Sequence, residues 1–476
     1  MGGTWDLFRY PGVRSDSDMY TLGYRFRPWR DNKSMADGPS ILSYIRETAT
    51  EYGVDKLIRY DHRVRRASWS SDDMRWMVEV ETGSNLGDFE RKLVQFSCKF
   101  LYLCTGYYDY ESGYTPEWRG VERFRGTVVH PQKWPENLDY AGKRVVVIGS
   151  GATAVTLVPA MAERAAHVTM LQRSPSYIVS RPAEDRVANW FRKCLPDTTA
   201  YAAARWKNVL AGTFFYRLAR KRPNIFKWMV ARGVRKQLGA AYDPKHFTPP
   251  YNPWDQRLCL VPDADLFKSI RGGRVSLMTD HIETFTEDGL QLTSGEQLKA
   301  DIIVTATGLV LKLFSGMQLE LNGVPVDMPK MLVYKGMMFS DIPNLAFAVG
   351  YTNASWTLKC DLAAGYVCRL LNHMDRHGYA TCTPRVNDSD IELEPVLDFN
   401  SGYVLRALPS LPRQGSKTPW RLHQNYVKDL SMMRFGRVED GTMEFKAAPV
   451  AQRTETATGP NAQTQSEAQA GALGHG

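Results

Sequence analysis

The residues of this chain that most clearly suggest chemistry form a glycine-rich turn, Gly149-x-Gly151-x-x-Ala154. An apolar run precedes the turn and a helical pattern follows it, which is the context that gives this motif meaning. The first glycine permits a tight turn, the second lets a pyrophosphate approach the backbone, and the small third residue lets helix and strand pack closely. We therefore expect a dinucleotide site that comprises the whole turn: Gly149, Ser150, Gly151, Ala152, Thr153 and Ala154.

The residues after the second predicted strand of this unit indicate which dinucleotide binds. The acidic residue that usually binds the ribose is absent, and Gln172-Arg173-Ser174 stands in its place. An arginine at this position suits a 2′-phosphate, so we predict NADPH, with Arg173 and Ser174 in its site. A glycine turn in an unrelated α/β protein remains the alternative.

Two further patterns precede this unit. Residues 124–135 read Phe-x-Gly-x-x-x-His-x-x-x-Trp-Pro, and residues 2–16 read Gly-Gly-x-Trp-x-x-x-x-Tyr-Pro-Gly-x-x-x-Asp. Both patterns, in this order, resemble the signatures of the Baeyer–Villiger monooxygenase family. Residues 251–258 and 350–359 are similar to the actinobacterial branch of that family which activates the thioamide prodrug ethionamide. The resemblance extends from residue 2 to about residue 445. The alternative is a relative that has lost the family's activity and retains only the framework of its motifs.

The resemblance implies roles for individual residues. Arg257 matches the active-site arginine of the family, and a permanently charged guanidinium suits the stabilisation of a peroxide anion. Asp16 matches the acid that pairs with this arginine between flavin and nicotinamide. Tyr107, which follows Thr105-Gly106, is a further candidate for the flavin side. The other positions implied to lie along FAD are Thr4, Trp5, Asp6, Leu7 and Val64, and those near NADP are Arg14, Ser15 and Asp16.

The activity implied is that of a monooxygenase that uses FAD, NADPH and O₂. It would insert oxygen into ketones and oxidise sulfides or thioamides through a C4a-peroxyflavin. One alternative is an N- or S-oxygenating flavin monooxygenase without ketone activity. Another is a non-catalytic NADPH-binding pseudoenzyme, because no FAD fingerprint precedes Gly2.

The elements that must position these residues indicate an α/β fold with two Rossmann-type domains. Family members carry a strand, a glycine turn and a helix before the Gly-Gly-x-Trp signature, so the resemblance implies that the FAD domain is N-terminally truncated. We expect about forty missing residues and a translation start assigned to an internal methionine, Met1. Predicted segments are a helix at 40–52, alternating strands at 56–64, 75–80 and 89–97, and a buried strand at 144–148.

The expected domains follow from these elements. Residues 1–140 would form the first part of the FAD domain, and residues 141–308 the NADP domain with a helical insertion at about 183–238. Residues 309–446 would return to the FAD domain and form the C-terminal segment. Residues 447–476 are rich in Ala, Gln, Thr and Gly and predict a disordered tail.

Composition limits the kinds of binding partner and the cellular compartment that we expect. Charged residues make up 23% and the net charge is +9, but residues 181–236 hold fourteen Lys/Arg against three acids. This local block lacks a nucleic-acid motif, so we expect no nucleic acid as partner. It allows weak peripheral contact with anionic lipid. Seven cysteines without metal-ligand spacing predict no metal and suit the cytoplasm, and no apolar run is long enough to span a membrane. The sequence does not specify the oligomeric state.

Overall fold

The computed structural model describes residues 1–83 and 91–448. A five-stranded parallel sheet in the order β11-β8-β7-β15-β6 organises the middle of the chain. Parallel sheets are covered on both faces, which explains the continuous apolar run of β7. The strands are β6 (Thr127–Val129), β7 (Arg144–Ile148), β8 (His167–Gln172), β11 (Val275–Thr279) and β15 (Ile302–Thr305).

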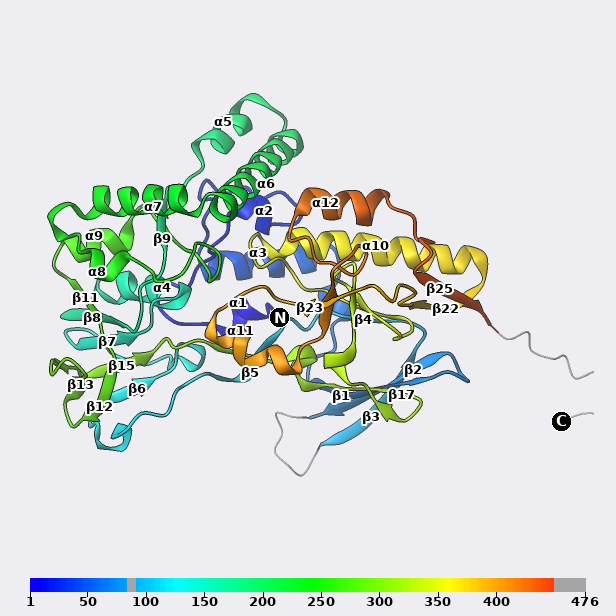
Figure 1. Cartoon of the computed structure of the whole chain (residues 1–476), viewed down its shortest axis with the longest axis horizontal. Helices are drawn as coiled ribbons and strands as arrows, with labels where there is room; N and C mark the ends of the chain where they lie inside the picture. The colour runs from blue at the N-terminus through cyan, green and yellow to red at the C-terminus, as the bar shows by residue number, and fades with distance from the viewer. Residues whose placement is uncertain (84–90, 449–476) are drawn as a thin grey trace, which may run out of the picture.

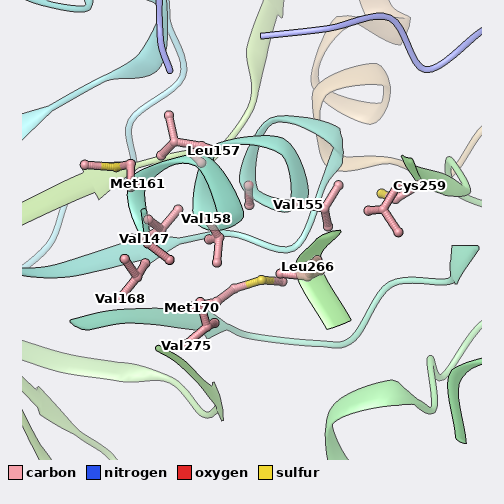
Figure 2. Packing of buried hydrophobic residues seen from close by; sticks show 14 of the residues in the cluster. Val147, Val155, Leu157, Val158, Met161, Val168, Met170, Cys259, Leu266 and Val275 are labelled. Carbon is pink, nitrogen blue, oxygen red and sulfur yellow. The ribbon is translucent and has the colours of Figure 1, made fainter. Parts of the chain in front are cut away.

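Helix α4 (Ala152–Met161) packs on this sheet, and the two share a hydrophobic core. Figure 2 shows Leu157, Val158 and Met161 of this helix packed above Val147 of β7 and Met170 of β8. Helix α9 (Asp265–Arg271) contributes the buried Leu266 to the same cluster. The predicted strand–turn–helix–strand unit is therefore present, with the turn at the carboxyl end of β7.

The predicted helical segment forms three helices between β9 (Ile178–Arg181) and β10 (Cys259–Pro262), which pair in parallel. They are α5 (Arg186–Cys194), α6 (Asp197–Lys221) and α7 (Pro223–Leu238), and they lie along the upper margin of the molecule in Figure 1. Two prolines separate the helices, because Pro196 caps α6 and Pro223 begins α7. Proline suits a first helical turn, where its missing N–H has no partner to lose.

A second, mixed sheet has the order β18-β17-β1-β2-β3. Its strands are β1 (His62–Ser70), β2 (Arg75–Thr82), β3 (Lys92–Cys98), β17 (Gln318–Leu321) and β18 (Val324–Pro325). Strand β1 pairs in parallel with β17, so segments some 250 residues apart lie together. Nearby, β4 (Leu101–Leu103) pairs in parallel with β21 (Leu345–Phe347). The predicted strand at 89–97 lies partly on residues 89–90, outside the described residues.

Two long helices accompany this half of the molecule, α3 (Gly38–Glu51) and α10 (Trp356–His377). The side chain of Asp37 caps α3 by accepting a hydrogen bond from the Ser40 N–H at 2.8 Å. The remaining helices are α1 (Thr4–Leu7), α2 (Met19–Leu22), α8 (Pro244–Phe247), α11 (Gly402–Ala407) and α12 (Tyr426–Leu430).

The remaining strands form small antiparallel units. They are β5 (Tyr108–Gly113), β12 (Ile282–Thr286), β13 (Gly289–Leu292), β14 (Gln297–Lys299), β16 (Leu309–Leu311), β19 (Val333–Tyr334), β20 (Met338–Phe339), β22 (Tyr379–Pro384), β23 (Leu393–Pro395), β24 (Arg413–Gly415) and β25 (Met443–Ala447). The predicted tail, 447–476, lies outside the described residues from 449 onward. Among the described helices, none has the length and apolar character needed to cross a membrane.

Candidate active site

The glycine turn has the shape that a phosphate site requires. Gly149 has a φ of 138°, and a Cβ there would lie 2.3 Å from the carbonyl oxygen of Ala306. A Cβ on Gly151 would meet nothing within 4 Å, so the turn is open on the side from which a ligand would approach. No side chain of the described residues caps the first turn of α4, which leaves backbone N–H groups and the positive end of the helix dipole for an anion.

Arg173 and Ser174 lie beside this turn. Arg173 follows directly after β8 and is exposed, while Ser174 accepts a hydrogen bond from the Ser150 hydroxyl at 3.0 Å through its carbonyl oxygen. Gln172, just before them, is buried and donates to the Thr279 hydroxyl and the His246 carbonyl. Arg173, which is predicted to bind the 2′-phosphate, is thus an exposed cation at the end of the second strand, without an ion pair to any described residue.

Arg14 supplies a second cationic group. Its Nη1 donates to Asp265 at 2.5 Å, and the side chain is only 13% exposed. Its Nε and Nη2 are buried and have no hydrogen-bond partner among the described residues. Buried donors normally have partners, so these two suit an anionic ligand. These two unpartnered Arg14 atoms and the open glycine turn together make this region suitable for the phosphate of a dinucleotide. The neighbouring Ser15 is buried, and its hydroxyl bonds locally to Ser17.

The loop at residues 10–16 is held against α4. Tyr10 hydrogen-bonds Thr153 in the first turn of the helix, and burial raises the pKa of Tyr10 to about 12. Gly12 has a φ of 74°, and a Cβ there would lie 2.6 Å from the Cβ of Ala160. Gly12 therefore lets the loop pass close to α4, and Asp16 follows four residues later in the chain.

Asp16 meets Arg257 at this point, as predicted. The Arg257 Nη1 lies 3.4 Å from the Asp16 Oδ2, with side chains 30% and 36% exposed. The charge of Asp16 raises the pKa of Arg257 well above its usual value, against the opposing effect of burial. Arg257 precedes β10, where the Cys259 thiol lies 3.7 Å from the Ser150 carbonyl oxygen. The strand thus connects the guanidinium to the glycine turn.

Both members of this pair line a cavity of about 630 Å³. Its walls come from β9 and β10, from α6 and α7, and from the segments at 352–358 and 423–428. The walls also contain several residues to which the sequence analysis assigned no role: Asn208, Tyr216, Trp254, Gln424 and Asn425. They converge from separate segments, and none belongs to a recognisable spacing pattern except Trp254, which lies within residues 251–258.

A cluster of aromatic residues surrounds the inner end of the site. The Tyr107 ring lies 4.5 Å from that of Tyr108 and 4.7 Å from that of Trp356, centroid to centroid. Burial raises the pKa of Tyr107 well above its usual value and that of Tyr403 to about 12, so both remain neutral phenols. Tyr107, Trp356 and Tyr403 line a second, smaller cavity that shares Thr352 and other wall residues with the first. Aromatic side chains such as these can pack against a flat ring system.

The positions expected along FAD are less closely grouped. Thr4 hydrogen-bonds Tyr110, Leu7 packs on the core of the parallel sheet, and Trp5 packs on a neighbouring cluster. Asp6 forms ion pairs with Arg9 and Arg46, at 2.8 and 3.0 Å. Val64 is exposed on β1, and it lines neither cavity.

His130 of the Phe-x-Gly-x-x-x-His pattern contacts three separate segments of the chain. Its Nδ1 accepts from the Gln132 N–H, and its Nε2 lies 3.2 Å from the Gly308 carbonyl oxygen. Burial lowers the pKa of His130, so the imidazole is neutral. A Cβ on Gly113 would lie 1.9 Å from the ring, so the histidine joins β5 and β6 to the turn after β15.

A fixed guanidinium beside a cavity, with an anion site at the neighbouring glycine turn, can bind a nucleotide and stabilise negative charge on a reacting oxygen. Comparisons with known proteins agree with this chemistry. Residues 30–371 match the model of the "FMO-like: Flavin-binding monooxygenase-like" family. The FAD-containing monooxygenase EthA of Mycobacterium tuberculosis is 53% identical over 94% of this chain and 91% of its own length.

Solved structures show the same fold. An oxidised steroid monooxygenase bound to NADP matches with a TM-score of 0.69 and 20% identity, over 94% of this chain and 93% of that one. The polycyclic ketone monooxygenase of the fungus Thermothelomyces thermophila gives 0.72 and 16%, over 94% and 83%. The predicted α/β fold and the predicted family are confirmed. The family model and the extent of the likeness to EthA establish that the chain belongs to the flavin-binding monooxygenase-like family.

Proposed function

We propose that this flavin-dependent monooxygenase uses NADPH and O₂ to convert ketones to esters and to oxidise sulfides or thioamides at sulfur. The observation that carries the proposal is the Arg257–Asp16 pair in the wall of the large cavity, next to the open glycine turn. In the balanced reaction, one oxygen atom of O₂ enters the substrate and the other leaves as water. NADPH supplies the two electrons.

Different features of the structure support the binding of NADPH and of FAD. For NADPH, the turn at Gly149 and Gly151 would hold the pyrophosphate, while Arg173 and Arg14 would bind phosphate groups. For FAD, the aromatic side chains around the cavity near Tyr107 would pack against the flavin ring. Reduced FAD supplies the chemistry that activates O₂. The named relative EthA is FAD-containing, which agrees with this assignment.

Arg257 would act as the electrostatic partner of the reacting oxygen. Its guanidinium is charged at every relevant pH, and the wall of the cavity gives it a fixed position. Asp16 would orient the guanidinium through their ion pair. Preorganised charge of this kind costs no reorganisation when negative charge develops on oxygen or on the substrate carbonyl.

The domain assignment remains a proposal as well. The range 141–308 contains four strands of the parallel sheet, and β6 joins that sheet from residues 127–129. We propose that 1–140 and 309–446 together form the FAD-binding part. We also propose that the protein works in the cytoplasm.

Product analysis tests the proposed reaction. The purified protein, supplied with FAD, would be given NADPH, isotopically labelled O₂ and either an aryl ketone or an aryl sulfide. We expect an ester and a sulfoxide, each with one labelled oxygen, at the expense of one NADPH. A sulfoxide without ester would instead favour the N- or S-oxygenating enzyme. NADPH binding without flavin binding would favour the pseudoenzyme.

A further inference from the structure

Helix α6 carries an unusual row of exposed apolar side chains, Trp206, Leu210 and Phe214. Residues spaced by four lie on one face of a helix, because each residue turns it by about 100°. The same face continues toward the C-terminus with the exposed cations Arg217 and Lys221. The outer side of α6 therefore carries a row of apolar residues followed, toward the C-terminus, by two cations.

Helix α7 repeats the arrangement. Ile225, Trp228 and Met229 are exposed near its N-terminus, and the exposed Arg232 and Lys236 lie on the same side further along. The guanidinium carbon of Arg232 lies 5.5 Å from the centre of the Trp228 ring. We call the six apolar residues of both helices the α6–α7 face, and their exposed fractions range from 39% to 62%.

The inner side of these helices forms the wall of the large cavity. Val209 and Tyr216 of α6 and Phe226 and Val234 of α7 line it. Met229 is both exposed and a cavity residue, so the cavity wall and the α6–α7 face meet there. An apolar molecule held at the face would therefore lie beside the cavity that contains Arg257.

We propose that the α6–α7 face rests on the surface of a membrane that contains anionic lipids, and that apolar substrates reach the cavity from there. Tryptophan, leucine and phenylalanine with flanking cations are the residues that bind a helix within the interfacial region of a bilayer. Each lysine or arginine near an anionic surface adds about 1 kcal/mol. The substrate route rests on the proposed function, whereas the binding does not.

A second copy of this chain suits the surface less well. A twofold interface would bring the same patch against itself and place its cations near one another. Residues 181–236 carry fourteen Lys/Arg against three acids, so such a contact would be repulsive. Anionic headgroups compensate this charge instead.

Vesicle co-sedimentation tests the proposal independently of oxygenation. We expect the protein to sediment with phosphatidylcholine vesicles that contain phosphatidylglycerol, and much less with phosphatidylcholine alone. The double variant Phe214→Ser/Trp228→Ser should lower partitioning about tenfold, because two interfacial anchors are lost. Lys221→Glu/Lys236→Glu should lower it by at least fivefold for each cation removed.

A matched control uses exposed leucines away from this face. Leu57 and Leu393 are 80% and 59% exposed, so Leu57→Ser/Leu393→Ser removes comparable apolar surface and should leave sedimentation unchanged. Equal loss in this control would overturn the proposal, as would failure of the unmodified protein to bind the anionic vesicles. Concentration-dependent dimers that the Phe214→Ser/Trp228→Ser variant abolishes, without vesicle binding, would show a protein interface and overturn it too.

Discussion

The Nη1 atom of Arg257 lies 3.4 Å from the Oδ2 atom of Asp16, in the wall of the large cavity. Asp16 lies at the end of the loop at residues 10–16, which packs along α4. Arg257 lies in the segment just before β10. The backbones of both residues are held by packing that does not involve their charged ends, since the loop packs on α4 and Cys259 of β10 contacts Ser150 of the glycine turn. Truncation of the Arg257 side chain should therefore affect chemistry without disturbing the glycine turn.

Arg257→Ala should separate chemistry from cofactor binding. Loss of one preorganised electrostatic partner typically lowers turnover by about 10²- to 10³-fold. We expect ester and sulfoxide formation to fall by this amount while the Kd of NADPH, measured by fluorescence quenching, stays the same. Arg181→Ala, at another cavity arginine that has no part in the ion pair, is the control. Product formation unchanged by Arg257→Ala would remove this residue from the proposed role.

The two glycines of the turn should respond differently to alanine. Gly149→Ala forces a positive φ and a contact with Ala306, so it should destabilise the fold by at least about 2 kcal/mol. Gly151→Ala has space and a φ of −81°, so thermal stability should not change. The added methyl group would nevertheless obstruct the pyrophosphate and raise the Kd of NADPH about tenfold. Equal stability losses in both variants would contradict this account.

Arg173→Ala should change the choice of nucleotide. A charge-assisted hydrogen bond contributes about 1.5–3 kcal/mol, so the Kd of NADPH should rise by roughly ten- to a hundredfold. The Kd of NADH, which lacks the 2′-phosphate, should change little. Isothermal titration with both nucleotides measures the ratio. An equal effect on the two would show that Arg173 does not recognise the 2′-phosphate.

Local patterns in the sequence predicted the elements around the glycine turn and two strands of the mixed sheet, β2 and β3, but misplaced the first strand of that sheet. Residues 144–148 were predicted as a strand and form β7 with these bounds, because an apolar run and a glycine turn both specify it. The strand predicted at 56–64 begins only at His62. Residues 55–57 form a 3-10 turn in which the Asp55 carboxylate accepts from the Lys56 N–H, and this local bond outweighs a weak alternation.

The site was predictable only where it follows motifs. Arg257 and Asp16 belong to two segments that carry the family resemblance, and the structure brings them together as the resemblance implied. Tyr403 lies on α11, far from any motif, and reaches the aromatic cluster through tertiary packing that no spacing pattern encodes. Trp356 stands within residues 350–359, so that segment could have indicated its position.

Stability should depend on pH through His130. Burial lowers its pKa in the folded protein below the unfolded value of about 6.5. The unfolded chain therefore binds more protons in mildly acidic solution. Stability is fully present above about pH 6.5 and is lost as the pH falls through the folded pKa. We expect the Tm of the unmodified protein to fall on acidification from pH 7 more steeply than that of His130→Gln, which cannot titrate there. Parallel pH profiles would contradict the assignment.

The buried pair of Lys359 and Asp429 should contribute to stability only as a pair. Their Nζ and Oδ2 atoms are 2.8 Å apart, both side chains are buried, and the Tyr351 hydroxyl also donates to Asp429 at 2.7 Å. Burial lowers the pKa of Lys359, which shows the cost of holding this charge away from water. Lys359→Met would leave Asp429 buried without its cation, at a cost of about 3–5 kcal/mol.

The variant Lys359→Met/Asp429→Leu removes both charges, and its loss in urea-unfolding free energy should be clearly smaller than the sum of the two single losses. The exposed pair of Lys417 and Asp388, at 2.9 Å, offers the control. Lys417→Met should change stability little, because water already screens that pair. Additive losses at Lys359 and Asp429 would mean that the two charges are not coupled in the folded protein.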